Sequence, residues 1–177
     1  MKYVPKLFIE TSVFNFYFDG KNGQKQKDSI RLFGEIAKGR YEAYSSQEVL
    51  DEFKAASEEK SRLMLDLYEQ YIKKTIPVTP EAQLLAETYI QKRIIPKKYL
   101  NDGLFIAIAT VNNLDFVISF NLGHIVKTKT MIGTGLANLR QGFRQIGRAN
   151  TVGEVPLVRG SSNCSTSCIT MCGCAAL

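Results

Sequence analysis

Short apolar runs alternate along the chain with segments whose apolar residues recur at helical spacing. The runs with the length of buried strands are residues 6–9, 41–44, 76–78 and 116–119. The helical spacing is found in residues 28–38, 46–59, 61–73, 80–91, 102–111 and, interrupted by glycines, 131–146. This alternation predicts an α/β domain in which a central, mostly parallel sheet is covered by helices on both faces.

Local signals place several of these boundaries. Thr79 stands before Pro80, which is the usual order of a capping residue and a first helical residue. Ser45 and Ser46 are suited to cap the helix that follows them. The segment Glu10-Thr11-Ser12 supplies capping chemistry after the first strand. The proline at 77 removes a ladder donor and therefore predicts that the run at 76–78 is an edge strand.

Four polar residues stand at the ends or starts of segments that are otherwise core: Glu10, Glu52, Asp102 and Asn121. Buried acidic groups are costly unless they are paired or bound to a metal. In parallel sheets, functional residues gather at the carboxyl ends of the strands. Three carboxylates and one carboxamide together would form an oxygen-rich site for Mg²⁺ or Mn²⁺, the chemistry of phosphodiester hydrolysis.

Composition narrows the classes of protein. The chain has 177 residues, a formal charge of +6 and a pI near 9.1, which fits one basic domain with a polyanionic partner. A single histidine, His124, disfavours a Ser-His-Asp triad, and its expected role is structural. We find no secretory signal and no membrane-spanning stretch, so we expect a cytoplasmic protein.

The order and spacing of the polar positions and their flanking runs resemble the PIN-domain family, and within it the VapC-like branch of single-domain bacterial ribonucleases. The matching segments are residues 7–13, 44–53, 102–110 and 114–121, and the resemblance covers roughly residues 6–146. It implies a three-layer α/β/α PIN-like fold, with a domain at residues 1–148. It also implies a metal-dependent ribonuclease, the toxin of a toxin–antitoxin pair, with a cognate antitoxin as partner and a homodimeric assembly.

The resemblance also implies roles for individual residues. Glu10, Glu52 and Asp102 would be the acidic ligands of Mg²⁺ or Mn²⁺, and Asn121 would be the fourth position of the site. The residues that would support them are Thr11, Ser12, Ser119 and Asp115. For Asp115, which stands just before the last strand, a structural role is the favoured alternative.

Three positions depart from the family pattern. Glu10 and Asn121 stand where the family usually has Asp, and Gly103 replaces the more usual Ala. The neutral Asn121 lowers the charge of the site. An alternative function is therefore a catalytically impaired PIN-fold module that binds RNA or serves as a scaffold, and a third is a nuclease that acts on DNA.

Basic residues provide a hypothesis for RNA contact. The densest cluster lies close before Asp102 and comprises Lys92, Arg93, Lys97 and Lys98. A second basic region comprises Lys127, Lys129, Arg140, Arg144 and Arg148. Such groups bind phosphates, and single-stranded or loop RNA is the expected substrate.

The end of the chain differs from the rest. Residues 149–177 are rich in Ser, Thr and Cys and are expected to be a disordered extension. All four cysteines lie there: Cys164, Cys168, Cys172 and Cys174. Their spacing fits no usual zinc module, and a prenylation box, a modified-peptide precursor and a frame change remain alternatives.

Overall fold

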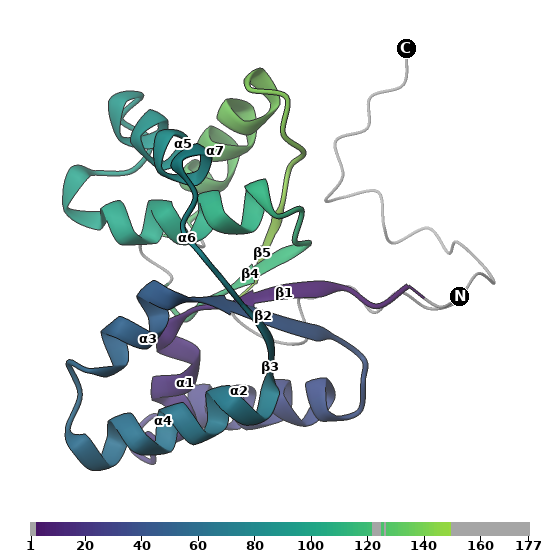
Figure 1. The fold of residues 1–177 in the computed structure, drawn as a ribbon, viewed down its shortest axis with the longest axis vertical. Coiled ribbons are helices and arrows are strands. Elements are labelled where there is room, and N and C mark those ends of the chain that lie inside the picture. Colours follow the sequence, from purple (N-terminus) through teal and green to yellow (C-terminus); the bar gives the residue numbers. More distant parts are fainter. Residues whose placement is uncertain (1–2, 122–124, 126, 150–177) are drawn as a thin grey trace.

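Five parallel strands form one sheet at the centre of the computed structural model, which describes residues 3–121, 125 and 127–149. The strands are β1 (Lys6–Ile9), β2 (Glu42–Ser46), β3 (Ile72–Ile76), β4 (Phe116–Ile118) and β5 (Gly147–Ala149). Their order in the sheet is β3-β2-β1-β4-β5, so β1 lies at the centre (Figure 1). The chain thus starts in the middle of the sheet and builds outward first to one side and then to the other.

Helices cover both faces of the sheet and complete a three-layer α/β/α fold (Figure 1). The helices on one face are α1 (Thr11–Tyr17), α2 (Gly23–Ala37), α3 (Gln47–Phe53) and α4 (Glu58–Tyr71). Those on the other face are α5 (Pro80–Gln91), α6 (Leu100–Val111) and α7 (Thr128–Arg140), with a short 3-10 helix, Lys97–Tyr99, before α6. The predicted fold class is confirmed, and every pairing in the sheet is parallel.

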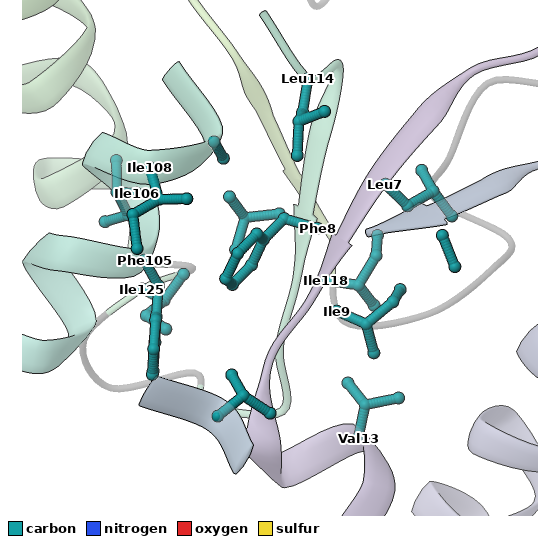
Figure 2. Packing of buried hydrophobic residues seen from close by; sticks show 14 of the residues in the cluster. Leu7, Phe8, Ile9, Val13, Phe105, Ile106, Ile108, Leu114, Ile118 and Ile125 are labelled. Atoms are coloured by element: carbon teal, nitrogen blue, oxygen red, sulfur yellow. The ribbon is translucent and has the colours of Figure 1, made fainter. Parts of the chain in front are cut away.

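The sheet divides the hydrophobic core into two halves, and side chains of β1 point into both. Phe8 of β1 points to the side of α6, where its ring lies 5.6 Å from that of Phe105 (Figure 2). Leu7 and Ile9 point to the opposite side, toward Val13 (Figure 2). All of these side chains are fully or almost fully buried, as the short apolar run at the start of the chain predicts.

The aromatic group near the end of α1 is part of this packing. Phe14 is fully buried, and its ring lies 5.5 Å from Phe33 and 5.2 Å from Phe53. Tyr17 packs edge-on against Phe33 at 5.5 Å. These contacts fasten α1 to α2 and α3, and so fix the helix that follows Glu10.

Several predicted boundaries are wrong. The helix expected over 46–59 ends at Phe53, and the helix expected over 61–73 is α4, which begins earlier, at Glu58. The Ser57 side chain caps this earlier start by accepting a hydrogen bond from the Lys60 amide. The edge strand expected at 76–78 lies at 72–76 instead. Its middle residues are exposed lysines and a threonine, so it has no apolar run to reveal it.

The last strand, β5, is absent from the predicted elements, and α7 begins and ends earlier than the predicted 131–146. The sequence Gly147-Arg148-Ala149 is too short and too polar to be recognised as a strand. Gly147 is needed because a Cβ atom there would lie 2.3 Å from the ring of Phe116 on the neighbouring strand. The start of α5 is confirmed, since Thr79 Oγ1 accepts a hydrogen bond of 3.2 Å from the Ala82 amide.

Two expectations lie outside the described residues: the structural role of His124, and the Cys-rich extension, of which only Ala149 is described. Among the residues that the structure describes, no helix has the length and apolar character needed to cross a membrane.

Candidate active site

The carboxyl ends of the two central strands bring Glu10 and the segment after β4 together. Glu10 follows β1 directly, and its amide donates a hydrogen bond of 3.2 Å to the carbonyl of Ile118, the last residue of β4. Ser12 Oγ accepts a hydrogen bond of 2.9 Å from the Phe120 amide and donates one to Glu10 Oε2. Residues 10–12 and 118–121 are therefore joined by backbone and side-chain contacts, although about a hundred residues separate them in sequence.

Glu52 reaches this group from α3. Thr11, the first residue of α1, donates a hydrogen bond to Glu52 Oε2. On the other side, the side-chain Nδ2 of Asn101 donates a hydrogen bond of 3.4 Å to Glu52 Oε1. The Glu52 carboxylate is thus held between the start of α1 and the start of α6.

Asp102 lies in the first turn of α6 and contacts the fourth predicted position. Asn121 Nδ2 donates a hydrogen bond of 3.0 Å to Asp102 Oδ2. The Asn121 amide in turn donates to Ser119 Oγ at 2.9 Å. Hydrogen bonds therefore link Asn121 to Asp102 and to Ser119. Glu52 joins the group through Thr11 and Asn101, which are the sequence neighbours of Glu10 and Asp102.

Burial sets the protonation of the first carboxyl. Glu10 is only 6% exposed, and burial raises its pKa from 4.5 to about 7. Hydrogen bonds from Ser12 and Ser119 act in the opposite direction, and the negative charge of Glu52 adds to the increase. The ionised form of Glu10 is therefore costly here, although two hydroxyl groups are arranged to stabilise it.

Asp102 shows the same behaviour to a smaller extent. Burial, followed by repulsion from Glu52, raises the pKa of Asp102 to about 6, while the hydrogen bond from Asn121 lowers it. None of the ion pairs within the described residues includes Glu10, Glu52 or Asp102. Three acidic groups thus stand near one another without a basic partner among the residues that the structure describes.

The chemistry of these donors fits a hard divalent cation, since all of them offer oxygen. Within the described part of the chain, however, no three His, Cys, Asp or Glu side chains are grouped closely enough to hold a metal ion together. Mg²⁺ commonly keeps several of its waters and uses only one or two carboxylates directly. An arrangement in which some of these carboxylates act through water is therefore compatible with the ion.

One predicted supporting residue lies elsewhere. Asp115 precedes β4 and so stands at the opposite end of that strand from Asn121. Its Oδ2 accepts a hydrogen bond of 2.7 Å from the Lys6 amide, and its Oδ1 forms an ion pair of 2.9 Å with Arg144. These contacts give Asp115 the structural role that the sequence also allowed.

Sequence reasoning missed Asn101 as a member of the site. Asn101 is adjacent to Asp102, and its side-chain amide faces Glu52. The predicted RNA-contacting residues, Lys92, Arg93, Lys97 and Lys98, are all exposed and lie between the end of α5 and the start of α6.

Comparisons with known proteins agree with the fold. No family model matches the chain, and no curated protein matches it by sequence. One similar solved structure is described as VapBC2 from Rickettsia felis bound to a DNA fragment from their promoter. The TM-score is 0.50 at 16% identity, over 67% of this chain and 89% of the other. Together with the topology, this similarity defines a PIN-like α/β/α fold.

Proposed function

We propose that the protein is a metal-dependent endoribonuclease that hydrolyses RNA phosphodiester bonds. The observation that carries the proposal is the group of three acidic residues at the carboxyl ends of the strands, which have no cationic partner within the described residues. Glu10 is buried among them. Burial of unpaired carboxylates opposes folding, so a site of this kind is expected to gain a cation when it functions.

Glu10, Glu52 and Asp102 would hold Mg²⁺ or Mn²⁺. The bound ion would supply an activated water and offset negative charge on the phosphate. Ser12 and Ser119 orient the Glu10 carboxylate, and Thr11 orients that of Glu52. Asn121 positions Asp102 through its side-chain amide and would offer the same amide to a phosphate oxygen.

The exposed cations before α6 would contact RNA. Lys92, Arg93, Lys97 and Lys98 lie on one segment that leads into the helix bearing Asp102. Contacts of such groups with phosphates give affinity that depends strongly on salt and little on sequence. Single-stranded RNA is the preferred substrate class, because its bases are free to stack and to be read.

The biological role that we propose is that of a toxin neutralised by an antitoxin. Its support is the likeness of the fold to a chain of the Rickettsia felis VapBC2 complex. An antitoxin segment that brings basic residues to Glu10, Glu52 and Asp102 would supply the partners that these acids lack within the described chain. A homodimer is the proposed assembly of the toxin.

The test is cleavage of mixed single-stranded RNA with Mg²⁺ or Mn²⁺. The intact protein is expected to cut, and Asp102→Asn is expected to lose at least about 100-fold in rate, because a ligand carboxylate is lost. The matched control is Asp66→Asn, which removes the same charge from an exposed position of α4. Equal rates for all three proteins, or cutting that persists in EDTA, would contradict the proposal.

A second candidate is a PIN-fold module that binds RNA without cutting it. The observation in its favour is Asn121, which is neutral and already occupies one oxygen of Asp102 by a hydrogen bond. RNA binding without cleavage by the intact protein, together with cleavage by Asn121→Asp, would favour this candidate.

A further inference from the structure

The structure brings residues from both basic regions of the sequence together around one cavity. This cavity, called here the basic cavity, has a volume of about 350 Å³. It is lined by Arg93, Ile94, Ile95, Pro96, Lys98, Tyr99, Lys127, Lys129 and Thr130. Four of these side chains are cationic and none is acidic, although Arg93 and Lys98 are about 30 residues away from Lys127 and Lys129 in sequence.

The four cations have no acidic partner in the part of the chain that the structure describes. None of its ion pairs includes Arg93, Lys98, Lys127 or Lys129. All four side chains are exposed. Four like charges around one hollow repel one another, and a bound anion would relieve that repulsion.

The backbone holds the two walls of the basic cavity close together. Gly133 of α7 packs against Ile94 so closely that a Cβ atom at 133 would lie 2.8 Å from Ile94 Cγ2. Arg93 has a φ of 55°, in the left-handed region that a non-glycine residue adopts only at a cost. The chain therefore keeps a cationic side chain at a position where glycine would fit the backbone better.

The basic cavity adjoins the candidate active site along the chain. Lys98 and Tyr99 of its wall belong to the short helix that runs directly into α6, whose first turn carries Asp102. The Lys98 ammonium lies 4.8 Å from the centre of the Tyr99 ring. An aromatic ring beside phosphate-binding cations is a common feature of sites for single-stranded nucleic acid.

From these observations we propose that the basic cavity binds a backbone phosphate of the RNA strand that lies across the acidic site. It would hold a phosphate that flanks the one to be cut, through Arg93, Lys98, Lys127 and Lys129. This inference rests on the proposed function for its choice of RNA. It goes beyond that function by assigning a second phosphate site, which requires no metal.

The test is binding of a fluorescent single-stranded oligouridylate to the full chain in EDTA, measured by anisotropy at several salt concentrations. Lys129→Gln is expected to weaken binding about tenfold and to reduce the slope of log affinity against log salt by about 1. The matched control is Lys27→Gln, which removes one exposed lysine from α2 on the opposite face of the sheet. Equal affinities for the two variants would overturn the proposal.

Arg93→Gly provides a second variant, and this substitution is not expected to lower the stability of the protein. Because glycine suits the φ of 55°, the variant is expected to melt no lower than the parent while it binds oligouridylate about tenfold more weakly. Unchanged affinity would count against the site. If Lys129→Gln and Arg93→Gly kept RNA affinity but lost binding of polyglutamate, the cavity would instead belong to an acidic protein segment, and the phosphate assignment would be wrong.

The two proposals can fail separately. Binding that depends on the basic cavity, in a protein that cuts no RNA with any divalent ion, would retain the phosphate site and reject the ribonuclease. Metal-dependent cutting by a protein whose RNA affinity is indifferent to Lys129 and Arg93 would reject the phosphate site alone.

Discussion

The acids at the two ends of the sheet differ in the partners that surround them. At the amino ends of the strands, Glu42 pairs with Lys73, whose hydrogen bond lowers the pKa of that carboxyl. Burial acts to raise the pKa of Asp115, but hydrogen bonds from Lys6, Tyr3 and Arg144 outweigh it and leave the pKa lowered. At the carboxyl ends, Glu10 and Asp102 have no cationic partner within the described residues, and their pKa values are raised.

This difference distinguishes acidic residues that stabilise the fold from acidic residues that destabilise it. A paired carboxylate contributes to stability, whereas a buried carboxylate without a partner reduces it. A protein retains the second kind where function requires it, because perturbed groups of this type gather at functional sites. The contrast between the two ends therefore predicts opposite responses to substitution and to pH.

The largest expected effect is on the pH dependence of stability without metal. Glu10 and Asp102 keep their protons in the folded protein up to a pKa of about 7 and about 6, whereas the unfolded chain releases them near 4.5 and 3.8. Above about pH 5 the carboxyls with lowered pKa values, such as Glu42 and Asp115, are ionised in both states, so Glu10 and Asp102 dominate. The folded state then binds more protons than the unfolded chain, so the free energy of unfolding falls as the pH rises from about 5 to 7. Denaturant melts in EDTA across this range would measure a loss of at least about 3 kcal/mol. A flat or rising curve would contradict the assigned environments.

Glu10→Gln is expected to have the next largest effect. At a pH above 7 the substitution removes a buried charge but keeps a hydrogen-bond acceptor for Ser12, so the metal-free protein gains up to about 3 kcal/mol in unfolding free energy. Chemical denaturation in EDTA would measure the gain. The matched control is Glu58→Gln in the exposed first turn of α4, which is expected to show no gain, and an equal response of both variants would refute the contrast.

Asp115→Asn is expected to act in the opposite direction. The substitution removes the charge that pairs with Arg144 and weakens the bond to the Lys6 amide, which costs about 1–2 kcal/mol. The same denaturation experiment measures this loss. Stabilisation by Asp115→Asn would show that the two ends of the sheet do not differ as described.

The smallest effect is expected at Gly103, beside Asp102. A Cβ atom at this position would lie 3.4 Å from Ile95 Cδ1, an ordinary contact, so Gly103→Ala fits. It should raise the unfolding free energy by about 0.5–1 kcal/mol through helix propensity. A loss of stability in thermal melts would indicate that the start of α6 is tighter than the contact distances imply.

Strong local signals in the sequence are sufficient to predict the elements at the centre of the fold. The run at 6–9, the capped start of α5 and the apolar helix α6 were found because each is buried or capped by nearby residues. The positions of β3 and β5 could not be found in this way. Both are edge strands whose hydrogen bonds come from neighbours distant in sequence, and neither carries an apolar run.

The sequence predicted which residues form the candidate site better than it predicted the contacts between them. Resemblance to a family supplied Glu10, Glu52, Asp102 and Asn121, and hydrogen bonds link these residues directly or through their neighbours. The contact of Asn101 with Glu52 and the separation of Asp115 from the site depend on how α6 and β4 pack, which no local pattern encodes. The approach of Lys127 and Lys129 to Arg93 and Lys98 at one cavity has the same origin.

The central proposal is that Glu10, Glu52 and Asp102, at the carboxyl ends of the strands, bind a divalent cation. Thermal unfolding with and without Mn²⁺ tests it most directly. The intact protein and Glu10→Gln should be compared at one pH above 7. Without Mn²⁺ the variant is expected to melt at a higher temperature than the intact protein. With Mn²⁺ the melting temperature of the intact protein is expected to rise far more than that of the variant, because only the intact protein has the Glu10 carboxylate to bind the ion. An equal gain for both proteins, or no gain for either, would contradict the claim.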